Sequence, residues 1–427
     1  MNSPFQSRLP LSEPIDFLLA DVAIRVQLSA THHALAVGRY ESVNKWIERK
    51  DSPLKDRVEI FYPQGSMAIG ATVASKLEYD EFDIDLIAQL DLPAGTPPRQ
   101  MLDVLEAAIR GEPGSRYFDM AERRTRCIQI QYADGMHLDV TPMVRLPQLP
   151  ERCGFIFHAK HRHTSTDDQK IIANPWGFAQ WFSGRTPAER DFAMAFEARA
   201  AAFESTIVLA EAEVEPVPEH RHAFEKSMAV IALQLLKRWR NVQYDQREGR
   251  CPPSVVLAKF VADNANKTRT LSEELFHQAK QLKIAFEQAQ QRGQLIAVCN
   301  PACESDVFTD RWPGSLEAQS VFVSDLILLV KKLEQLRGDC DLDTMQRILS
   351  ELFGERPTLD AIKSLNRQSG QAIVDGRSRH IPGRGRFEIP VLPAAAAAAA
   401  AVSAISVSTL ASRATPKHTY FGGSNDG

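Results

Sequence analysis

The segment from Phe82 to Leu86 places two aspartates on one face of a predicted strand. Phe82, Ile84 and Leu86 alternate with Asp83 and Asp85. Because successive side chains of a strand point to opposite faces, the apolar residues share one face and both carboxylates share the other. Aspartate is depleted in strands, and like charges repel unless a cation lies between them. The pattern favours a divalent cation site; a hairpin with a charged solvent face is the alternative for a lone motif.

A turn of small residues precedes this strand. Gly65, Ser66 and Gly70 lie in YPQGSMAIG, between a predicted strand from Phe61 and the aspartate strand, which runs to Leu90. Backbone N–H groups of such a turn can approach phosphate oxygens closely, and the Ser66 hydroxyl is an added donor. The sequence therefore predicts phosphate and metal sites next to each other.

The two motifs together resemble a known active site. GSxxxG, followed about a dozen residues later by FDIDL, is similar to the nucleotidyltransferase superfamily that includes DNA polymerase beta. That family has a third carboxylate on a later strand, and Asp139 in MHLDVTPM fits, since Leu138 and Val140 take the opposite face. The tight-turn pair Asp134-Gly135 predicts that this strand pairs with the preceding one.

The resemblance implies a metal cofactor. Asp83, Asp85 and Asp139 would be the catalytic and metal-binding residues, holding two Mg²⁺ ions about 4 Å apart, with Mn²⁺ as the alternative ion. Mg²⁺ prefers hard carboxylate and phosphate oxygens, which three acids and a nucleoside triphosphate provide.

A wider set of segments resembles a narrower family. GRYESVNKW, YPQGSMAIG, FDIDL, HLDVTPM, IIANPWGFAQWF and LLKRWRN are similar to the CD-NTases, bacterial relatives of cGAS and the oligoadenylate synthases. The resemblance spans roughly residues 20 to 380. It implies condensation of ATP or other NTPs, with pyrophosphate release, into a cyclic di- or trinucleotide second messenger for anti-phage (CBASS-type) defence. Transfer to a protein or RNA acceptor, and a conjugated non-catalytic adaptor, are the alternatives.

The resemblance also assigns nucleotide-binding residues. Gln64, Gly65 and Ser66 would hold the phosphates of the donor nucleotide, Lys237 would reach its terminal phosphates, and Ser254 would assist. Each of the last two has a simpler interpretation. Lys237 suits the C-terminal end of the helix predicted from Phe224 to Arg240, and Ser254 suits the N-cap of the next helix.

The implied fold is α+β, a two-lobed polymerase-beta-like palm with a mixed sheet plus an all-helical second lobe. We expect a helical spine in 1–49, the palm in 50–215, the helical lobe in 216–382 and a low-complexity tail in 383–427. Helical spacing begins at Ile15, as one long helix or a broken pair to Glu48, and three helical runs with a loop at 300–313 occupy 271–365.

The composition limits the kinds of partner and metal site that the chain is expected to have. Among 427 residues the formal charge is −4, which gives no basic footprint and disfavours an extended nucleic-acid groove. Six scattered cysteines without a CxxC pair suggest neither a disulfide scaffold nor a zinc ribbon, and the first residues lack the apolar core of a signal peptide, so a cytoplasmic location is expected. The three histidines at His158, His161 and His163 are a weak metal motif, and loop histidines are the simpler interpretation.

The C-terminal tail changes character. Residues 391–411 are uncharged and include eight consecutive alanines. Alanine and serine contribute little to membrane insertion, so no membrane span is predicted. Many CD-NTases lie beside ubiquitin-transfer-like enzymes that conjugate them through the C-terminus, which would make Gly427 a conjugation site; a flexible end with a chance glycine is the alternative.

Overall fold

The structure is a computed structural model that describes residues 11, 13–74, 81–160, 167–210, 226–374, 379–380 and 387–388. Its elements, in order, are α1 (Pro14–Val26), α2 (Ala30–Ile47), β1 (Val58–Pro63), α3 (Gly65–Ala68), β2 (Phe82–Leu90), α4 (Pro98–Arg110), β3 (Ala121–Arg123), β4 (Ile128–Gln131), β5 (Met136–Arg145), β6 (Gly154–His158), β7 (Gln169–Ala173), α5 (Pro175–Arg185), α6 (Arg190–Ala210), α7 (Met228–Tyr244), α8 (Ser254–Asn264), α9 (Leu271–Gln291), β8 (Cys299–Asn300), β9 (Cys303–Val307), α10 (Leu316–Arg337), α11 (Leu342–Phe353), α12 (Glu355–Val374), β10 (Arg379–His380) and β11 (Phe387–Glu388).

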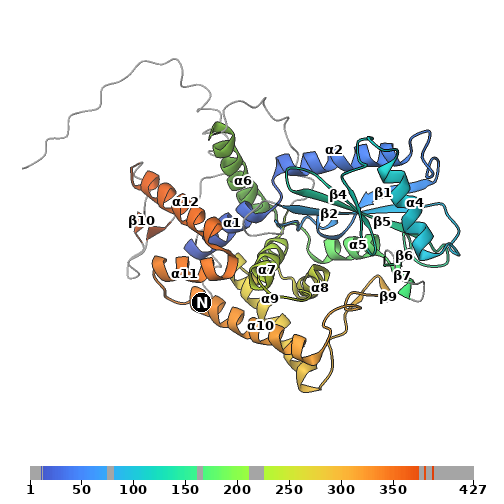
Figure 1. Cartoon of the computed structure of the whole chain (residues 1–427). Coiled ribbons are helices and arrows are strands. Elements are labelled where there is room, and N and C mark those ends of the chain that lie inside the picture. The colour runs from blue at the N-terminus through green and yellow to red at the C-terminus, as the bar shows by residue number, and fades with distance from the viewer. Residues whose placement is uncertain are drawn as a thin grey trace, which may run out of the picture. The chain divides into compact units, whose positions relative to one another are not determined.

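Seven strands of the described chain form one mixed sheet (Figure 1). The order is β1–β2–β5–β4–β3, and β6 pairs with the end of β5 and with β7. β2 is antiparallel to β1 but parallel to β5, and parallel neighbours need a crossover, which α4 and the β3–β4 hairpin supply. β5 is antiparallel to β4, which confirms the turn predicted at Asp134-Gly135.

The even-numbered residues of β2 face a core. Phe82, Ile84 and Leu86 are at most 3% exposed and pack with apolar side chains of α2 and α4. Burying each such side chain contributes roughly 1.5–3 kcal/mol. This confirms the period-two pattern, and because the core holds that face of the strand, Asp83 and Asp85 lie on the opposite face.

The N-terminal helical segment is a broken pair. α1 ends at Val26, the Ser29 side chain accepts a hydrogen bond from His32 N at the start of α2, and Gln27 between them bridges to Val73. The two helices bury different faces: α1 packs in the helical core and α2 packs against the sheet.

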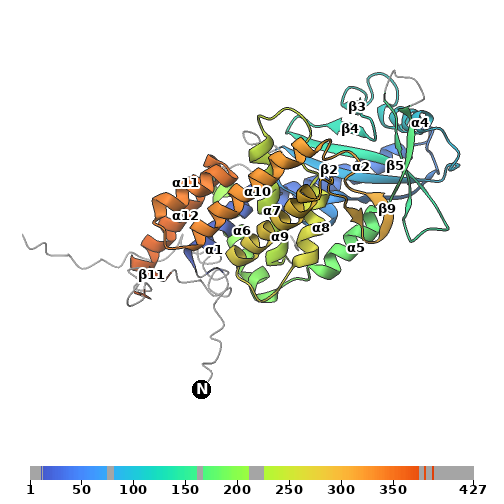
Figure 2. The ribbon, with the colours of Figure 1, turned by 90° about the horizontal axis from the view of Figure 1, so that it is seen from below.

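The second half of the chain is helical, as predicted. Helices α5 to α12, with α1, share one hydrophobic core, and α7, α8 and α9 lie side by side (Figure 2). α7 begins at Met228, later than the predicted Phe224, because the Ser227 side chain caps it by accepting from Val230 N. In place of the loop expected at 300–313, strands β8 and β9 form a short hairpin that contacts β7.

Several predicted features lie outside the described residues. These are His161, His163, the alanine-rich stretch 391–411 and Gly427, so the conjugation site remains a prediction. Of the helices that the structure does describe, none combines the length and apolar character needed to cross a membrane.

Candidate active site

Three aspartates lie at the centre of the sheet. In the parallel register of β2 and β5, Asp85 is the partner of Asp139, and Asp83 is the partner of His137. Neighbouring strands are about 4.8 Å apart, so Asp85 and Asp139 are direct neighbours on the polar face. The Asp83 side chain is 51% exposed, and its Oδ1 lies 3.5 Å from Nδ1 of His137. The fold thus brings the three predicted acids together.

The surroundings of Asp85 and Asp139 disfavour the ionised form of both carboxyl groups. Burial first, and then the charges of Asp139 and Asp83, raise the pKa of Asp85 to about 7. Burial also raises the pKa of Asp139, although Gln129 Nε2 donates a hydrogen bond to its Oδ1 at 2.9 Å and opposes the shift. Two adjacent carboxylates that are short of positive charge are stabilised when a cation binds between them.

The donor chemistry fits Mg²⁺. Within the described ranges, no group of three or more His, Cys, Asp or Glu side chains forms a ready-made metal cage. Mg²⁺ is usually held by one or two carboxylates together with waters and substrate phosphates, which is what the Asp85 and Asp139 pair offers, with Asp83 beside it. These residues would hold the ion, and the substrate would complete its coordination.

The predicted phosphate turn lies against these carboxylates. Gly65 begins the four-residue helix α3 with φ of +56°, and a Cβ atom placed there would lie 2.6 Å from Asp85 Oδ2. The Gln64 N–H donates to Asp85 O at 2.8 Å, and the Ser66 carbonyl accepts from Ala71 N at 2.8 Å. Only glycine permits this approach, which places the exposed backbone of the turn directly beside Asp85.

One face of α7 holds the chain that follows the turn. Lys237 Nζ donates to Ala71 O at 2.6 Å, Gln234 Nε2 donates to Thr72 O at 3.3 Å, and Asn241 Nδ2 donates to Ala74 O at 3.2 Å. Burial, and then the charge of Arg240, lower the pKa of Lys237 to about 7, while the nearby aspartates act in the opposite direction. Lys237 is therefore buried beside the turn and is not a surface cation at a helix end.

Ser254 is not the N-cap of its helix, in contrast to the simpler interpretation of the sequence. The N-cap of α8 is Pro253, Ser254 is the first helical residue, and no side chain caps this helix. The N-cap interpretation of Ser254 is therefore wrong. Since α8 contacts α3, Ser254 lies in the helix that packs on the phosphate turn.

Sequence reasoning missed three residues of this site: Gln129, Gln234 and Asn241. Gln129 had a readable signal, because the turn at Asp134-Gly135 sets the register that pairs Gln129 with Asp139. The other two are separated from Lys237 by three and four positions, the spacing of one helix face. What they bind depends on tertiary packing.

The comparisons with known proteins identify the family. Residues 17–169 match the model of the Second Messenger Oligonucleotide or Dinucleotide Synthetase domain. The cyclic dinucleotide synthase CdnG of Bradyrhizobium diazoefficiens is 39% identical over 414 residues, which cover 97% of this chain and 96% of that protein. The chain belongs to the CD-NTase family. It is therefore a nucleotidyltransferase, an enzyme of the class that makes nucleotide second messengers.

Solved structures agree with this assignment. The structure of the Bradyrhizobium diazoefficiens CD-NTase CdnG in complex with GTP has a TM-score of 0.73 at 40% identity, covering 84% of this chain and 99% of that one. The CdnC structure from E. coli MS115-1, at 13% identity and a TM-score of 0.53, covers 79% of this chain and 96% of that one and shows a similar fold. The c-di-GMP synthase of Roseivirga ehrenbergii is 24% identical over 365 residues, 83% of this chain and 89% of that protein.

Proposed function

We propose that this enzyme condenses nucleoside triphosphates, GTP among them, into a cyclic dinucleotide for anti-phage signalling. The observation that carries the proposal is the register of Asp85 with Asp139, directly beside Gly65. GTP is proposed because the similar CdnG was solved with GTP and another relative is named a c-di-GMP synthase.

The proposed roles follow from position. Asp83, Asp85 and Asp139 would hold Mg²⁺, which supplies positive charge to the attacking hydroxyl and to the leaving pyrophosphate. Gly65 and Ser66 bring backbone N–H groups and a hydroxyl to the phosphates. Asp139, whose pKa burial raises, accepts the proton of the attacking ribose hydroxyl.

Lys237 has a supporting role in this proposal. Its amine holds the Ala71 carbonyl and so fixes the turn that carries Gly65 and Ser66. The pKa of this amine is lowered to about 7, and the negative charge of an approaching phosphate would raise it again, so phosphate binding favours the charged amine. Transfer of this kind depends mainly on positioning and charge neutralisation, so preformed geometry contributes directly to the rate.

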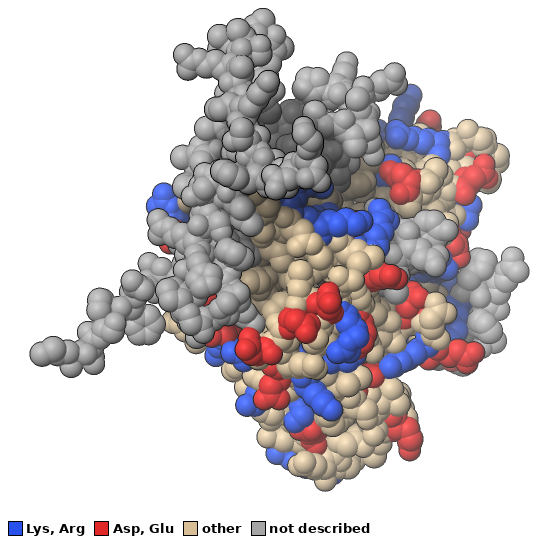
Figure 3. All heavy atoms as spheres, turned by 90° about the vertical axis from the view of Figure 1, so that its left-hand side faces the viewer, with Lys and Arg blue, Asp and Glu red and all other residues tan. Residues whose placement is uncertain are grey.

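Surface charge favours small substrates over nucleic acid. The formal charge is −4, and on the face shown in Figure 3 the described Lys and Arg side chains are interspersed with Asp and Glu. An RNA acceptor would be served by a continuous basic surface. This supports nucleotides as both donor and acceptor.

The test is incubation of the purified enzyme with four radiolabelled NTPs and Mg²⁺, followed by phosphatase treatment and chromatography. We expect a small phosphatase-resistant product whose formation stops when GTP is omitted. Label on the protein itself would instead favour a protein acceptor.

A double variant tests the roles of the acids. Asp83→Ala with Asp85→Ala should stay folded, because both side chains lie on the polar face, and should form no product. The matched control is Asp91→Ala, an exposed acid at the end of β2 whose ion pair with Arg57 lies on the surface. Full nucleotide consumption by the double variant would overturn the mechanism.

A further inference from the structure

A group of basic side chains lies at the side of the sheet away from the phosphate turn. Arg126, in the β3–β4 turn, makes an ion pair with Asp310 in the loop between β9 and α10, with 2.5 Å between Nη2 and Oδ2. Arg311 is the residue after Asp310. His158 is the last residue of β6, and Ala159, which follows it, donates its backbone N–H to Thr125 O in the β3–β4 turn at 3.0 Å. We call Arg126, His158 and Arg311 the basic cluster.

The basic cluster has unused hydrogen-bonding capacity. Arg126 Nε and His158 Nδ1 are buried and have no hydrogen-bond partner. Among the described residues, Arg311 makes neither an ion pair nor a hydrogen bond. Buried polar atoms are nearly always paired, so unpaired atoms grouped at one place indicate a missing ligand. Arg126 pairs with Asp310 and Arg311 only lies near it, so positive charge exceeds negative charge here and the ligand is an anion.

Burial and mutual repulsion both disfavour the positive charge of these groups. Burial, followed by the charges of Arg126 and Arg250, lowers the pKa of Arg311. Burial, followed by Arg126 and Arg311, lowers the pKa of His158. An anion placed among them would relieve this repulsion.

The basic cluster is close to the third carboxylate. Cys127, the residue after Arg126, hydrogen bonds to the Asp139 side chain, and the Cys127 thiol also interacts electrostatically with Arg311. One thiol therefore separates the cluster from Asp139.

Sheet order separates this cluster from the phosphate turn. The order β1–β2–β5–β4 places Gly65, which follows β1, on one side of the carboxylates and the β3–β4 turn on the other. In an in-line displacement the attacking and leaving groups lie on opposite sides of the reacting phosphorus. If the leaving pyrophosphate lies at Gly65, the attacking nucleotide enters from the side of the basic cluster.

We propose that Arg126, His158 and Arg311 bind the triphosphate of the acceptor nucleotide, the one whose hydroxyl attacks. The assignment rests on the proposed function and extends it to the second substrate. A triphosphate carries the negative charge that the cluster lacks, and arginine recognises phosphate through two parallel N–H donors.

The test uses different molecules for the donor and the acceptor nucleotide, so that binding of the acceptor can be measured separately. The labelled donor is a 2′,3′-dideoxy-NTP, which cannot attack. The acceptor is either α,β-methylene-GTP, which cannot donate, or guanosine, which has no phosphate. For the unmodified enzyme we expect a lower KM with the triphosphate acceptor. The ratio of the KM for guanosine to the KM for the triphosphate acceptor should fall about tenfold or more in Arg311→Ala. This is the loss expected for one charge-assisted hydrogen bond.

Two variants control the experiment. Arg311→Lys keeps the charge and should restore part of the ratio. Arg347→Ala removes an exposed arginine of α11 that pairs with Glu351, and it should leave the ratio unchanged. An unchanged ratio in Arg311→Ala, with its unfolding curve intact, would overturn the assignment.

A binding measurement keeps the inference testable apart from activity. Calorimetric titration with α,β-methylene-GTP should show two molecules per chain for the unmodified enzyme and one for Arg311→Ala. Two molecules in both proteins would contradict the basic cluster as a binding site. Absence of transfer by the unmodified enzyme would contradict the proposed function alone.

Discussion

At the scale of single residues, Gly65 sets how closely the phosphate turn approaches the carboxylates. Its φ of +56° is in the left-handed region, and the missing Cβ leaves room for Asp85 Oδ2. A side chain here would push the turn away from Asp85 or rotate the carboxylate. Backbone conformation and catalytic geometry therefore depend on the same residue.

Gly65→Ala should lower both stability and activity. The left-handed backbone costs about 1 kcal/mol for alanine, and the contact with Asp85 adds to it. We expect an overall loss of about 1–3 kcal/mol in the free energy of unfolding and a drop in product formation of at least about tenfold. Chemical denaturation and the radiolabelled NTP assay measure the two effects.

Gly293→Ala is the matched control. Gly293 has a similar φ of +64° with nothing within 4 Å of an added Cβ, so only the backbone cost remains and activity should persist. Equal activity of the two alanine variants would show that the approach of Gly65 to Asp85 is unimportant.

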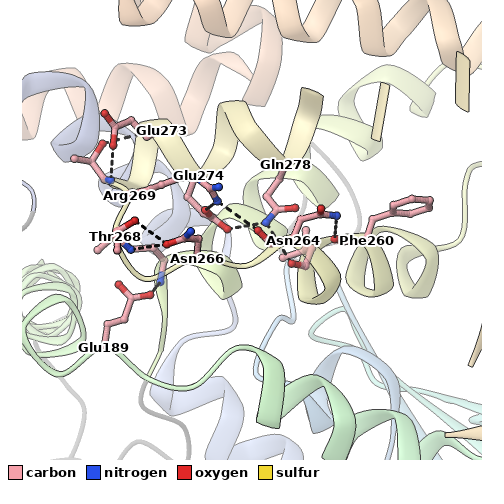
Figure 4. A network of polar contacts seen from close by, with 12 residues as sticks. Glu189, Phe260, Asn264, Asn266, Thr268, Arg269, Glu273, Glu274 and Gln278 are labelled. Atoms are coloured by element: carbon pink, nitrogen blue, oxygen red, sulfur yellow. Dashed lines mark hydrogen bonds and ion pairs between the residues drawn. The ribbon is translucent and has the colours of Figure 1, made fainter. Parts of the chain in front are cut away.

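Glu189 is a second residue of interest at this scale, because its surroundings disfavour the ionised form of its carboxyl group. It lies near a polar network in which Arg269 pairs with the fully buried Glu274 at 2.8 Å and Gln278 donates to the same carboxylate (Figure 4). Burial, and the charge of Glu274, raise the pKa of Glu189 to about 7, while Met228 N, donating at 3.4 Å, opposes the shift.

Glu189→Gln should therefore stabilise the protein at alkaline pH. The folded carboxyl binds its proton more tightly than the unfolded one, whose pKa is 4.5. The unmodified protein thus loses stability as pH rises from about 4.5 to 7, and the loss is complete above the folded pKa. Because Glu189 is only half-buried, we expect about 1 kcal/mol at pH 8 and little difference at pH 4.

Urea unfolding at both pH values measures this effect. Glu112→Gln, an exposed substitution in the loop after α4, is the control and should show no such difference. A Glu189→Gln variant that is less stable than the unmodified protein at pH 8 would show that the ionised carboxylate is stabilising.

At the scale of elements, two structures outside the sheet hold the site in place. One is the face of α7 that binds the carbonyls of Thr72, Ala71 and Ala74. The other is the β8–β9 hairpin, in which the buried Asn300 Nδ2 donates to Asn174 O and to Asp306 Oδ2, both at 2.8 Å. These contacts tie segments of the helical region to the edge of the sheet.

Asn300→Ala should release the hairpin from the sheet. It removes the hydrogen bonds to Asn174 O and Asp306 Oδ2, takes the Asn300 Oδ1 acceptor away from Ala302 N and opens a small cavity, so we expect a loss of about 2–3 kcal/mol in unfolding free energy. Asn266→Ala, in an exposed turn where the side chain accepts from Thr268, should cost less than about 1 kcal/mol. Similar losses for both, by chemical denaturation, would show that the Asn300 contacts do not hold the hairpin.

At the scale of the whole molecule, the described elements belong to one unit, residues Met1–Val391, and Leu392–Gly427 form a separate one. The aspartates, the phosphate turn, α7 and the basic cluster all lie in the first unit. Nothing in the proposed mechanism draws on the second.

Removal of Leu392–Gly427 should therefore leave synthesis intact. We expect the same rate of product formation and the same melting temperature as for the full chain, measured with the NTP assay and by calorimetry. A truncated enzyme that has lost its activity while still folded would show that the tail contributes to catalysis.

The sequence alone was sufficient for the local pattern of the site. Period-two alternation placed Asp83 and Asp85 on one face of a strand, and the same rule placed Asp139 on its own strand. These predictions succeed because a strand's side-chain direction is a property of the backbone. The CD-NTase assignment from short motifs was likewise confirmed.

Only the tertiary structure decided which of these faces meet. The parallel register that pairs Asp85 with Asp139, the contact of Lys237 with Ala71 and the joining of Arg126 to Asp310 each connect segments far apart in the chain. The two residues of β8 are too few to show a periodicity, and the β8–β9 hairpin is held by docking on the sheet. Long-range contacts depend on how elements pack, and packing combines many weak interactions that no local pattern encodes.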